Sequence, residues 1–570
     1  MKIPTIAPAV AAVATLTLLA AGCTSAKHKT TSPSGTVSGS QSASQSGAAA
    51  GHAKSTVLTI GLPDGPQTNN SNPFLNTSAA HALGYEYAIY EPLAQINDTR
   101  PTQKPIPWLA KSWTWNTNYT QIQITPRAGV TWSDGQPMTA QDIAYSLQLR
   151  KSNAALNTEG LPYKTITTDG KTVTVTFATS QYVNQIKVLQ LFVVPKHIWQ
   201  SIAKPTTDLN QKPVGTGPYT LTSWTTQAVT LDRNKSYWGG QVAVPQLRYT
   251  SYSGNDTFIT ALSTGAAQWG QAFIADYKNV YLSKNPNNKA FFPAGLGVDF
   301  LALNTTKAPF NDVAVRRAAN LVLDRAKASK IAESGVFPEL TSVTGIPTPA
   351  GNSFIASPYK GKTYQVDVAG AKKILTDAGY TYSGNTLKDK SGKAVTVTLQ
   401  DPAGWNDYDT DLQLIASSFK SIGISTTAQT PNVDAWTNAL NTGSFDAALH
   451  WTETGISPWT TYSDMFNPAF YVPTGKVAAW NYGRYRSPAA MAAFKAYTDA
   501  TNDAGRQSAL DALQKLFMDE VPAIPVNSRP ALSEYSTKYW TGFPQDSDPY
   551  ANPQPTSPEA ALIFTKLKPA

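Results

Sequence analysis

The chain has 570 residues with a formal net charge of +9, 41% apolar residues and a single cysteine, which describes a large globular protein with several domain-sized units. One cysteine excludes an internal disulfide or a thiolate zinc site, and the five histidines lie too far apart for an HExxH motif, so we expect no metal and no cofactor. Four of the lysines lie before residue 55, where no acidic residue occurs, so the remaining positive charge is sparse and we expect no nucleic acid partner.

A secretory signal peptide is predicted over residues 1–22. Lys2 supplies a positive start, the following residues up to Ala21 are almost wholly apolar or small, and Gly22 directly precedes Cys23. The Leu-Ala-Ala-Gly-Cys ending resembles the lipobox of bacterial lipoproteins, which implies cleavage before Cys23 and lipid attachment to this cysteine. We therefore expect an extracytoplasmic protein that is anchored to the bacterial cell membrane through its N-terminal lipid.

A linker is predicted over residues 23–55. This stretch is rich in Ser, Thr, Gly, Ala and Gln and contains almost no large apolar side chain. Such a composition cannot bury a core, so we expect the linker to be disordered. No later apolar run approaches the ~18–20 residues that a membrane-spanning helix needs.

The folded part is predicted to begin at Val57. Residues Val57–Leu62 form a short apolar run that ends at a Pro-Asp-Gly sequence, which predicts a buried strand. Thr139, with Asp142 three residues later, predicts a capping box at the start of an amphipathic helix. Alternating apolar residues predict further short strands at 121–125, 172–177, 229–232 and 246–250.

The second half of the chain is predicted to be more helical and more regular. Asn311 and Asp367 each precede an apolar pattern with helical spacing, so both are predicted as N-caps. Between residues 395 and 451 the chain alternates between strand and helix patterns, which predicts a parallel sheet with right-handed crossovers. The predicted elements are a strand at 395–399, a helix at 407–422, a strand at 424–429, a helix at 434–440 and a strand at 445–450.

A ligand site is predicted at the carboxyl ends of these parallel strands. In open parallel sheets, ligands bind outside that edge. The two loops that leave it, 401–407 and 451–459, contain three tryptophans and several carboxylates, which is typical of a cleft with apolar platforms and few polar anchors. The alternative is that these tryptophans pack the loops onto the core. The candidate residues are Trp405, Asn406, Asp407, Trp451, Glu453 and Trp459.

Several short motifs occur in a fixed order between residues 57 and 568. In this order and spacing they resemble the extracytoplasmic solute-binding proteins of ABC importers, in family 5, which holds oligopeptide, dipeptide, nickel and oligosaccharide receptors. The motifs include Tyr90-Glu91-Pro92-Leu93, Pro107–Trp113, Arg127 with Val130–Pro137, Gly215–Tyr219, Val315–Ala318 and Val521–Pro525.

The resemblance implies an α/β fold with two lobes, of the type II periplasmic-binding-protein class with an extra subdomain in the first lobe. It also implies a receptor, which we expect to be a monomer, that closes around a solute and delivers it to a membrane permease. The hinge crossings are expected near Phe300–Asn304 and Pro525–Asn527. The predicted division assigns residues 56–95, 214–300 and 526–570 to lobe I, 96–213 to the insert and 301–525 to lobe II.

Peptides are the first hypothesis for the ligand, because most members of this family are named for peptides. A peptide needs a carboxylate for its ammonium group and a cation for its carboxylate. The peptide receptors usually carry an aspartate soon after a tryptophan in the loop that begins here with Trp451, and this chain has Thr452-Glu453 instead. The candidate ammonium partners are Asp407, Asp409, Asp411 and Glu453, and the candidate carboxylate partners are Arg484 and Arg486.

Oligosaccharides are the alternative ligand. Sugar recognition uses flat aromatic rings and side chains that offer two hydrogen bonds. Several short segments of the chain that combine an aromatic with an amide residue resemble segments in the branch of the family that includes cellobiose receptors. For Trp269 the competing interpretation is a structural aromatic on the lobe surface. The further candidates for ligand contact are Gln268, Trp269, Trp480 and Asn481.

Two other classes of protein are alternatives to a receptor. Ser417 and Lys420 fit the SxxK pattern of serine acyl-transferases, but no KTG or SDN partner motif and no GxSxG elbow is present in the chain, so we expect no enzyme. A surface adhesion or carbohydrate-binding module would suit the lipid anchor and the aromatic residues. Such a module would keep one rigid conformation, whereas a receptor closes on its ligand.

Overall fold

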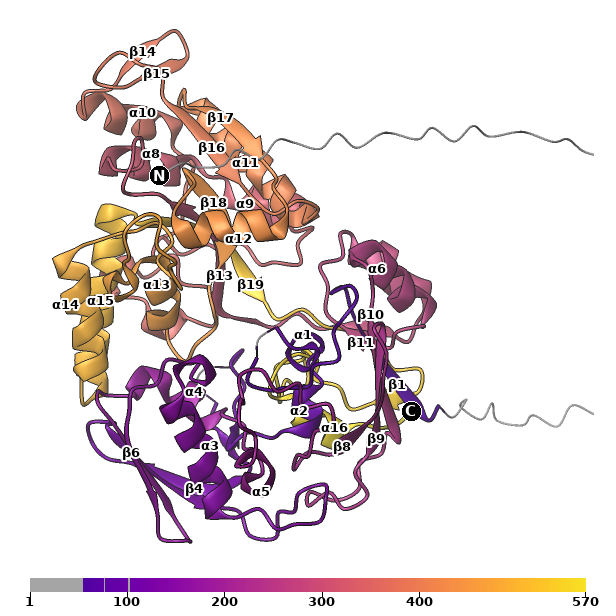
Figure 1. Cartoon of the computed structure of the whole chain (residues 1–570). Coiled ribbons are helices and arrows are strands. Elements are labelled where there is room, and N and C mark those ends of the chain that lie inside the picture. The colour runs from indigo at the N-terminus through magenta and orange to yellow at the C-terminus, as the bar shows by residue number, and fades with distance from the viewer. Residues whose placement is uncertain (1–54, 76, 101–102) are drawn as a thin grey trace, which may run out of the picture. The chain divides into compact units, whose positions relative to one another are not determined.

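The structure is a computed structural model that describes residues 55–75, 77–100 and 103–570. The described residues belong to one compact unit, and none of their helices is long and apolar enough to cross a membrane. The predicted signal peptide and the lipid attachment at Cys23 lie outside the described residues. The fold is of the α/β class, with three main sheets that have separate hydrophobic cores (Figure 1).

The first main sheet has seven strands, in the order β12-β20-β11-β1-β10-β9-β8, and is called lobe I below. The strand predicted at Val57–Leu62 is confirmed as β1, which pairs in parallel with both β10 and β11. Its Leu58 and Ile60 side chains are fully buried in the lobe I core. The strands are β1 (Val57–Leu62), β8 (Tyr219–Trp224), β9 (Ala228–Arg233), β10 (Gln246–Ser251), β11 (Trp269–Gly270), β12 (Asn288–Ala290) and β20 (Glu534–Ser536).

Short helices accompany this sheet, and small two-stranded sheets form elsewhere in the chain (Figure 1). The helices are α1 (Ala79–Leu83), α2 (Glu86–Ile89), α6 (Asn255–Thr264), α7 (Tyr277–Val280) and α16 (Ala560–Lys566). The small pairs are β2 (Ala94–Gln95) with β3 (Ile106–Pro107), β14 (Thr381–Ser383) with β15 (Thr386–Lys388), and β21 (Trp540–Thr541) with β22 (Lys568–Pro569).

The second main sheet, called the insert, has four antiparallel strands in the order β4-β5-β7-β6. The predicted capping box is confirmed at helix α3, because Thr139 accepts a helix N–H and the Asp142 side chain accepts the N–H of Thr139 at 2.8 Å. The elements are β4 (Ala110–Trp115), β5 (Gln121–Pro126), α3 (Ala140–Ser152), β6 (Tyr163–Thr168), β7 (Val173–Phe177), α4 (Gln185–Leu189) and α5 (Lys196–Trp199).

The third main sheet, called lobe II, has five strands in the order β17-β16-β18-β13-β19. The predicted strand and helix alternation is confirmed, since β16 pairs in parallel with both β17 and β18. Gly423 and Gly443 follow the two helices with φ of 80° and 73°, a conformation that suits glycine and ends each helix. The elements are β16 (Thr396–Gln400), α11 (Asn406–Ser421), β17 (Ser425–Gln429), α12 (Val433–Thr442) and β18 (Ala447–Trp451).

Further helices pack around lobe II. Asp367 is confirmed as the N-cap of α10, but the predicted cap Asn311 is wrong by one residue. Asp312 caps α8, because its backbone is extended and its side chain accepts the N–H of Ala314. The helices are α8 (Val313–Val322), α9 (Arg325–Lys327), α10 (Val368–Asp377), α13 (Pro458–Phe466), α14 (Pro488–Asp499) and α15 (Asp503–Glu520).

Two antiparallel strands, β13 (Ala294–Leu303) and β19 (Ala523–Pro530), connect the sheets of lobes I and II and are called the linking strands. The predicted hinge positions Phe300–Asn304 and Pro525–Asn527 lie within or directly beside the paired part of the lobe II sheet. The chain leaves that sheet closer to lobe I, where the register shifts between Ala294 and Val298. The predicted division of the chain into lobes and insert stays a prediction.

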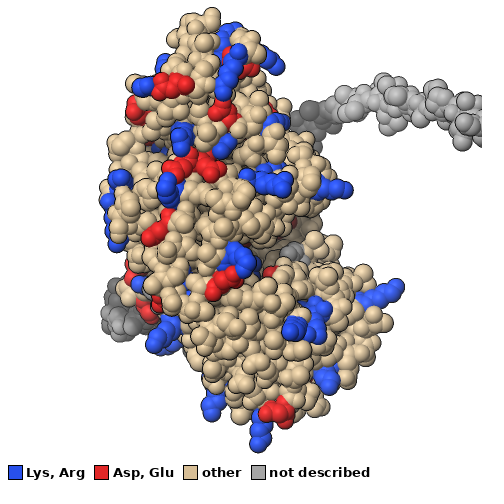
Figure 2. Space-filling view, turned by 90° about the vertical axis from the view of Figure 1, so that its left-hand side faces the viewer, with Lys and Arg blue, Asp and Glu red and all other residues tan. Residues whose placement is uncertain are grey.

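The insert also contacts lobe II directly. The Arg506 guanidinium of α15 lies 3.3 Å from the centroid of the Tyr182 ring in the insert, and the Tyr497 ring of α14 lies 6.1 Å from the same ring. A buried guanidinium against an aromatic face is a favourable cation–π contact. On the face drawn in Figure 2, basic and acidic side chains are interspersed among uncharged residues.

Candidate ligand-binding site

A cavity of about 310 Å³ lies where lobe I, lobe II and the linking strands meet. Lobe II contributes Trp451 at the end of β18 and the residues that follow it, including Glu453. The linking strands contribute Gly295 and Arg529, and the lobe I side contributes Asp98 together with Gln271 and residues 552–556. The lining is mainly polar and includes charges of both signs. This cavity is called the interlobe cavity below.

Backbone pairing fixes the loop that follows β18. The N–H of Thr452 donates to the carbonyl of Val298 at 2.9 Å, and the Thr452 hydroxyl accepts the Val298 N–H at 3.1 Å. The N–H of Glu453 donates to the buried Asp464 carboxylate at 2.8 Å, which leaves the Glu453 side chain exposed at the cavity. A Cβ at Gly295 would lie 2.8 Å from the Thr454 methyl group, so glycine is needed for this close approach.

Arg529 is the cationic group of the cavity. One of its N–H groups donates to Asp299 Oδ1 at 2.7 Å, and its guanidinium lies 5.1 Å from the Trp451 ring centroid. Burial alone would lower the pKa of Arg529, but the negative charge of the fully buried Asp299 raises it, so the side chain stays charged. Tyr408 also donates to Asp299 Oδ1, at 2.8 Å. The Arg529 side chain is 35% exposed.

Asp98 is the second acidic group of the cavity. Its pKa is raised to about 6. Burial is the main cause, and the charge of Glu453 acts in the same direction, while a hydrogen bond of 2.9 Å from the Asn552 amide opposes them. The influence of Glu453 on Asp98 means that the two carboxylates are electrostatically connected across the cavity. The cavity therefore combines two acidic side chains with one guanidinium.

Two of the three predicted tryptophans lie together. The ring centroids of Trp405 and Trp451 are 5.9 Å apart, and Trp436 and His450 complete the cluster, with the His450 ring stacked on Trp451 at 4.2 Å. Burial lowers the pKa of His450 to about 4, so its imidazole is neutral in this cluster. Because Arg529 also contacts Trp451, the Trp451 ring is largely engaged by protein groups.

Trp459 and Trp480 lie beside the lobe II core. The Trp459 ring packs against Phe494 and Tyr497, with centroid distances of 5.9 and 6.3 Å. Trp480 packs against His450 and Tyr482, each at 5.9 Å. Both tryptophans are half-buried, and neither lines the interlobe cavity.

Three predicted ligand contacts have structural partners instead. Trp269 is 0% exposed and donates its ring N–H to the Pro553 carbonyl at 3.0 Å, so the prediction of a ligand platform is wrong. Asn481 is also fully buried, and its amide donates to the carbonyls of Asn467 and Tyr485, so it too is wrongly predicted. Gln268 uses both ends of its amide to hold the N–H of Thr59 and the carbonyl of Gly265.

The arginines proposed for a ligand carboxylate lie elsewhere. Arg484 is 1% exposed and donates to the carbonyls of Asn441 and Tyr482, so it holds the backbone of lobe II. Arg486 is exposed, with its guanidinium 5.4 Å from the Tyr471 ring centroid. Neither arginine lines the interlobe cavity, which leaves Arg529 as the arginine of this site.

A second hollow, of about 400 Å³, brings Asn406 and Gly404 of lobe II against residues 253–257 of lobe I. Asn406 is exposed there, as a ligand contact requires. The neighbouring Asp407 is half-buried, and its pKa is raised by burial and by the charge of Asp299, while Arg529 acts in the opposite direction. The loop before α11 therefore faces lobe I across this hollow.

A cluster of buried carboxylates beside the linking strands was not predicted from the sequence. Asp411 and Glu333 are fully buried, and the amide of Asn527 donates to both, at 2.8 and 3.3 Å. Burial raises the pKa of both carboxyl groups well above the usual range, and the charge of Asp411 adds to this effect at Glu333, as the charge of Asp299 does at Asp411. The signal available in the sequence was a charged residue within an apolar run, as at Asp299 between Val298 and Phe300.

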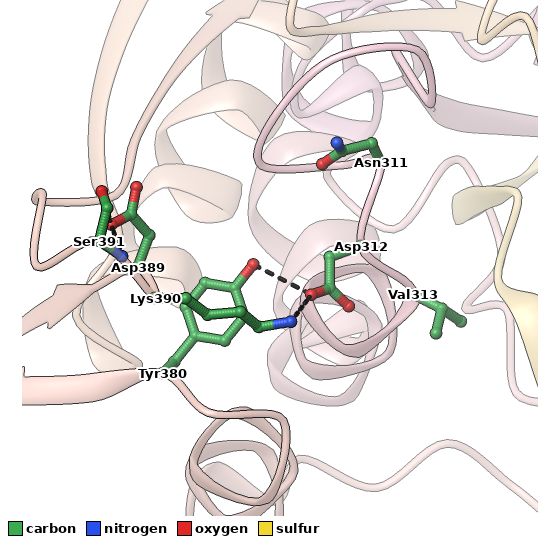
Figure 3. A pocket seen from close by; sticks show the side chains of 7 residues that line it. All are labelled: Asn311, Asp312, Val313, Tyr380, Asp389, Lys390 and Ser391. Atoms are coloured by element: carbon green, nitrogen blue, oxygen red, sulfur yellow. Dashed lines mark hydrogen bonds and ion pairs between the residues drawn. The ribbon is translucent and has the colours of Figure 1, made fainter.

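A larger hollow, of about 590 Å³, lies on lobe II around Asp312 (Figure 3). Lys390 and the Tyr380 hydroxyl both donate to Asp312 Oδ2, at 3.1 and 3.3 Å. The polar groups thus satisfy one another, and the carboxylate also caps α8. Among the described residues no group of three or more His, Cys, Asp or Glu side chains is arranged to hold a metal ion.

These features define a two-lobed solute-binding protein, and the comparisons with known proteins agree. The family described as bacterial extracellular solute-binding proteins, family 5, matches residues 104–474. The chain belongs to this family, whose members are solute-binding receptors of ABC importers. The resemblance inferred from the sequence motifs and the predicted two-lobed α/β fold are thereby confirmed.

The relatives bind different solutes. The chain is 26% identical to the glutathione-binding protein GsiB of Escherichia coli strain K12 over 455 residues, which is 76% of this chain and 82% of that protein. It is 26% identical to the nickel-binding periplasmic protein of the same strain over 341 residues, or 58% of this chain and 62% of that protein.

Solved structures share the fold. The mannohexaose-bound periplasmic oligopeptide-binding protein of Thermotoga maritima has a TM-score of 0.77 and 22% identity, covering 90% of this chain and 98% of its own. The oligopeptide-binding protein AppA of Bacillus subtilis, in complex with a nonapeptide, has a TM-score of 0.71 and 19% identity, covering 90% and 99%.

Proposed function

We propose that this receptor captures short peptides in the interlobe cavity and delivers them to the permease of an ABC importer. The observation that carries the proposal is the presence of Asp98, Glu453 and Arg529 in the lining of one cavity. A peptide carries an ammonium group and a carboxylate, so it can pair with charges of both signs. A neutral sugar can offer hydroxyl groups to these side chains but no opposite charge to either.

Arg529 is the proposed partner of the ligand carboxylate. Asp299 accepts one of its N–H groups, and the side chain is 35% exposed, so the guanidinium can donate further hydrogen bonds toward the cavity. Asp299 and Tyr408 hold the arginine in position before ligand arrives. Preorganisation of this kind lowers the entropic cost of binding.

Glu453 and Asp98 are the proposed partners of the ligand ammonium. Glu453 comes from lobe II, and Asp98 lies on the lobe I side, so a ligand that pairs with both would connect the two sides of the cavity. Asn406 and Asp407 remain candidates for a longer ligand that extends into the second hollow. Trp405 and Trp451 are proposed as apolar support beside Arg529. Trp459 and Trp480 stay predicted ligand contacts outside the interlobe cavity.

Closure of the lobes is proposed to occur through the linking strands. The register shift between Ala294 and Val298 interrupts regular pairing next to Gly295 and the cavity, where a change in backbone angles costs least. Attachment of lipid to Cys23 would keep a monomeric receptor close to the permease.

Oligosaccharides are the second candidate ligand. Gln271, Asn552, Gln554 and Thr556 also line the cavity and offer amide and hydroxyl groups suited to sugar hydroxyls. A similar structure is named for bound mannohexaose. Peptides are preferred because Trp451, the aromatic ring of the cavity, is already contacted by His450 and Arg529.

Native mass spectrometry of the purified protein tests the ligand class. Ligand that copurifies is released under denaturing conditions and identified, and isothermal titration calorimetry then compares di- to pentapeptides with cello- and manno-oligosaccharides. Peptide masses together with peptide binding would support the proposal. Hexose increments would assign the sugar alternative, and a protein that binds neither class would contradict both.

A further inference from the structure

A separate cavity of about 200 Å³ lies between lobe I and the insert. Its lining includes Phe74 and Glu86 from lobe I and Arg150, Glu159 and Phe192 from the insert side. None of the residues that line it lines the interlobe cavity. This cavity, called the insert cavity below, has no part in the proposed peptide site.

Arg150 brings unused hydrogen-bond donors to the insert cavity. The side chain is only 1% exposed, and its Nη1 donates to the carbonyl of Ser146 at 3.1 Å. Its Nε and Nη2 are buried and have no partner among the described residues. These two nitrogens form the side-on edge of a guanidinium, the edge that matches the two oxygens of a carboxylate.

Aromatic rings fix the orientation of this guanidinium. The Arg150 Cζ atom lies 4.7 Å from the centroid of Phe74 and 4.4 Å from that of Phe192. These rings cover the guanidinium without accepting its in-plane N–H groups. Burial lowers the pKa of Arg150, and the charge of Glu159 opposes that effect, yet no hydrogen bond joins the two side chains.

Unused acceptors lie in the same cavity. Glu86 is buried, with Oε1 hydrogen-bonded to His81 at 2.9 Å, and its Oε2 has no hydrogen-bond partner in the described part of the chain. Glu159 Oε2 is also buried and lacks a partner among the described residues. A buried polar atom that lacks a partner is costly, so both the donors and the acceptors of this cavity favour a ligand that supplies the missing groups.

We propose that the insert cavity binds a free α-amino acid with an apolar side chain. The ligand carboxylate pairs with Nε and Nη2 of Arg150, and its ammonium group pairs with Glu86 and Glu159. Its side chain lies against the aromatic walls formed by Phe74 and Phe192. The small volume limits the ligand to one residue, which separates this site from the proposed peptide site.

Calorimetry with L-leucine tests the proposal, using the full chain. Wild-type protein is expected to bind one L-leucine, whereas L-leucinamide, which lacks the carboxylate, and isocaproate, which lacks the ammonium group, should each bind at least tenfold more weakly. No binding of L-leucine, or equal binding of all three compounds, would overturn the proposal and leave ordered water as the occupant. These ligand comparisons need no variant, so they hold even if a substitution impairs folding.

Variants then locate the site. Arg150→Gln should weaken L-leucine binding at least tenfold. Glu159→Gln, at a half-exposed position, should weaken it about threefold. The double variant Arg529→Met with Asp299→Asn, in the interlobe cavity, should bind L-leucine as the wild type does. Loss of L-leucine binding in this double variant, with retention in Arg150→Gln, would place the amino acid in the interlobe cavity and overturn the proposal.

Discussion

Buried carboxylates lie at the junction of lobe I with the insert and also at the linking strands between the two lobes, and the surroundings of the two groups differ. At the junction of lobe I and the insert, the fully buried Glu91 accepts hydrogen bonds from Trp108, Tyr237 and Trp238, at 2.7, 2.6 and 2.7 Å. At the linking strands, Glu333 and Asp411 share the single amide of Asn527. The number of donors thus makes the first junction a fixed connection. The carboxylates of the second are incompletely satisfied, and they lie next to the strands that are proposed to move during closure.

Removal of the Glu91 carboxylate should have the largest effect on stability. In Glu91→Leu the two indole N–H groups and the Tyr237 hydroxyl lose their acceptor, at about 1–3 kcal/mol for each buried group. We expect the free energy of unfolding to fall by about 3–9 kcal/mol in total. Urea unfolding followed by tryptophan fluorescence measures this loss. A variant as stable as the wild type would show that the three donors do not depend on Glu91.

The pH dependence of stability should distinguish Glu91 from an amide. Burial raises its pKa from 4.5 to about 7, so the folded state holds the proton more tightly than the unfolded state. The contribution of Glu91 to stability therefore falls as pH rises from about 4.5 to 7 and is constant above that range. The difference in unfolding free energy between wild type and Glu91→Gln should change in this direction by about 3 kcal/mol. A difference independent of pH would contradict the raised pKa.

The paired charges at the linking strands should affect binding more than stability. The double variant Arg529→Met with Asp299→Asn removes the cation without leaving Asp299 charged and unpaired. We expect it to fold and to bind peptide ~10–100-fold more weakly, as the loss of a charge-assisted hydrogen bond predicts. Calorimetry measures the affinity, with Arg486→Gln as the matched control outside the cavity. Unchanged peptide affinity in the double variant would exclude Arg529 as the anchor.

The smallest effect on stability is expected for the buried pair of Glu333 and Asp411. Repulsion and burial favour a protonated form of Glu333 beside Asp411, so the amide in Glu333→Gln replaces a group that is already neutral. We expect a change in unfolding free energy of less than about 1 kcal/mol at neutral pH. A loss comparable to that of Glu91→Leu would remove the distinction between the two junctions.

Local patterns explain which parts of the fold were predicted correctly. The elements between residues 395 and 451 follow from apolar periodicity and from glycines that end each helix. The capping box at Thr139 depends on residues three positions apart. Trp405 and Trp451 were predicted to lie together because each follows a strand of the same parallel sheet, and their ring centroids are 5.9 Å apart. In each case the interacting groups are close in sequence or related by one crossover.

The errors in the site have the opposite cause. Trp269 was predicted to contact ligand, but its partner, the Pro553 carbonyl, lies 284 residues away. The pair of Arg529 with Asp299 spans 230 residues, and no local pattern connects them. Burial of an aromatic or charged side chain depends on such distant partners, so the type of residue alone does not decide between core and cleft.

The sequence by itself determined the family, the α/β class, the alternation of strands and helices between residues 395 and 451, and the loops at the carboxyl ends of these strands. These features depend on composition, motif order and periodicity. Only the tertiary structure decided which charged side chains meet. The interlobe cavity and the insert cavity each combine residues from distant parts of the chain, and their chemistry arises from burial and partner count. Both quantities are set by packing, which the local sequence does not contain.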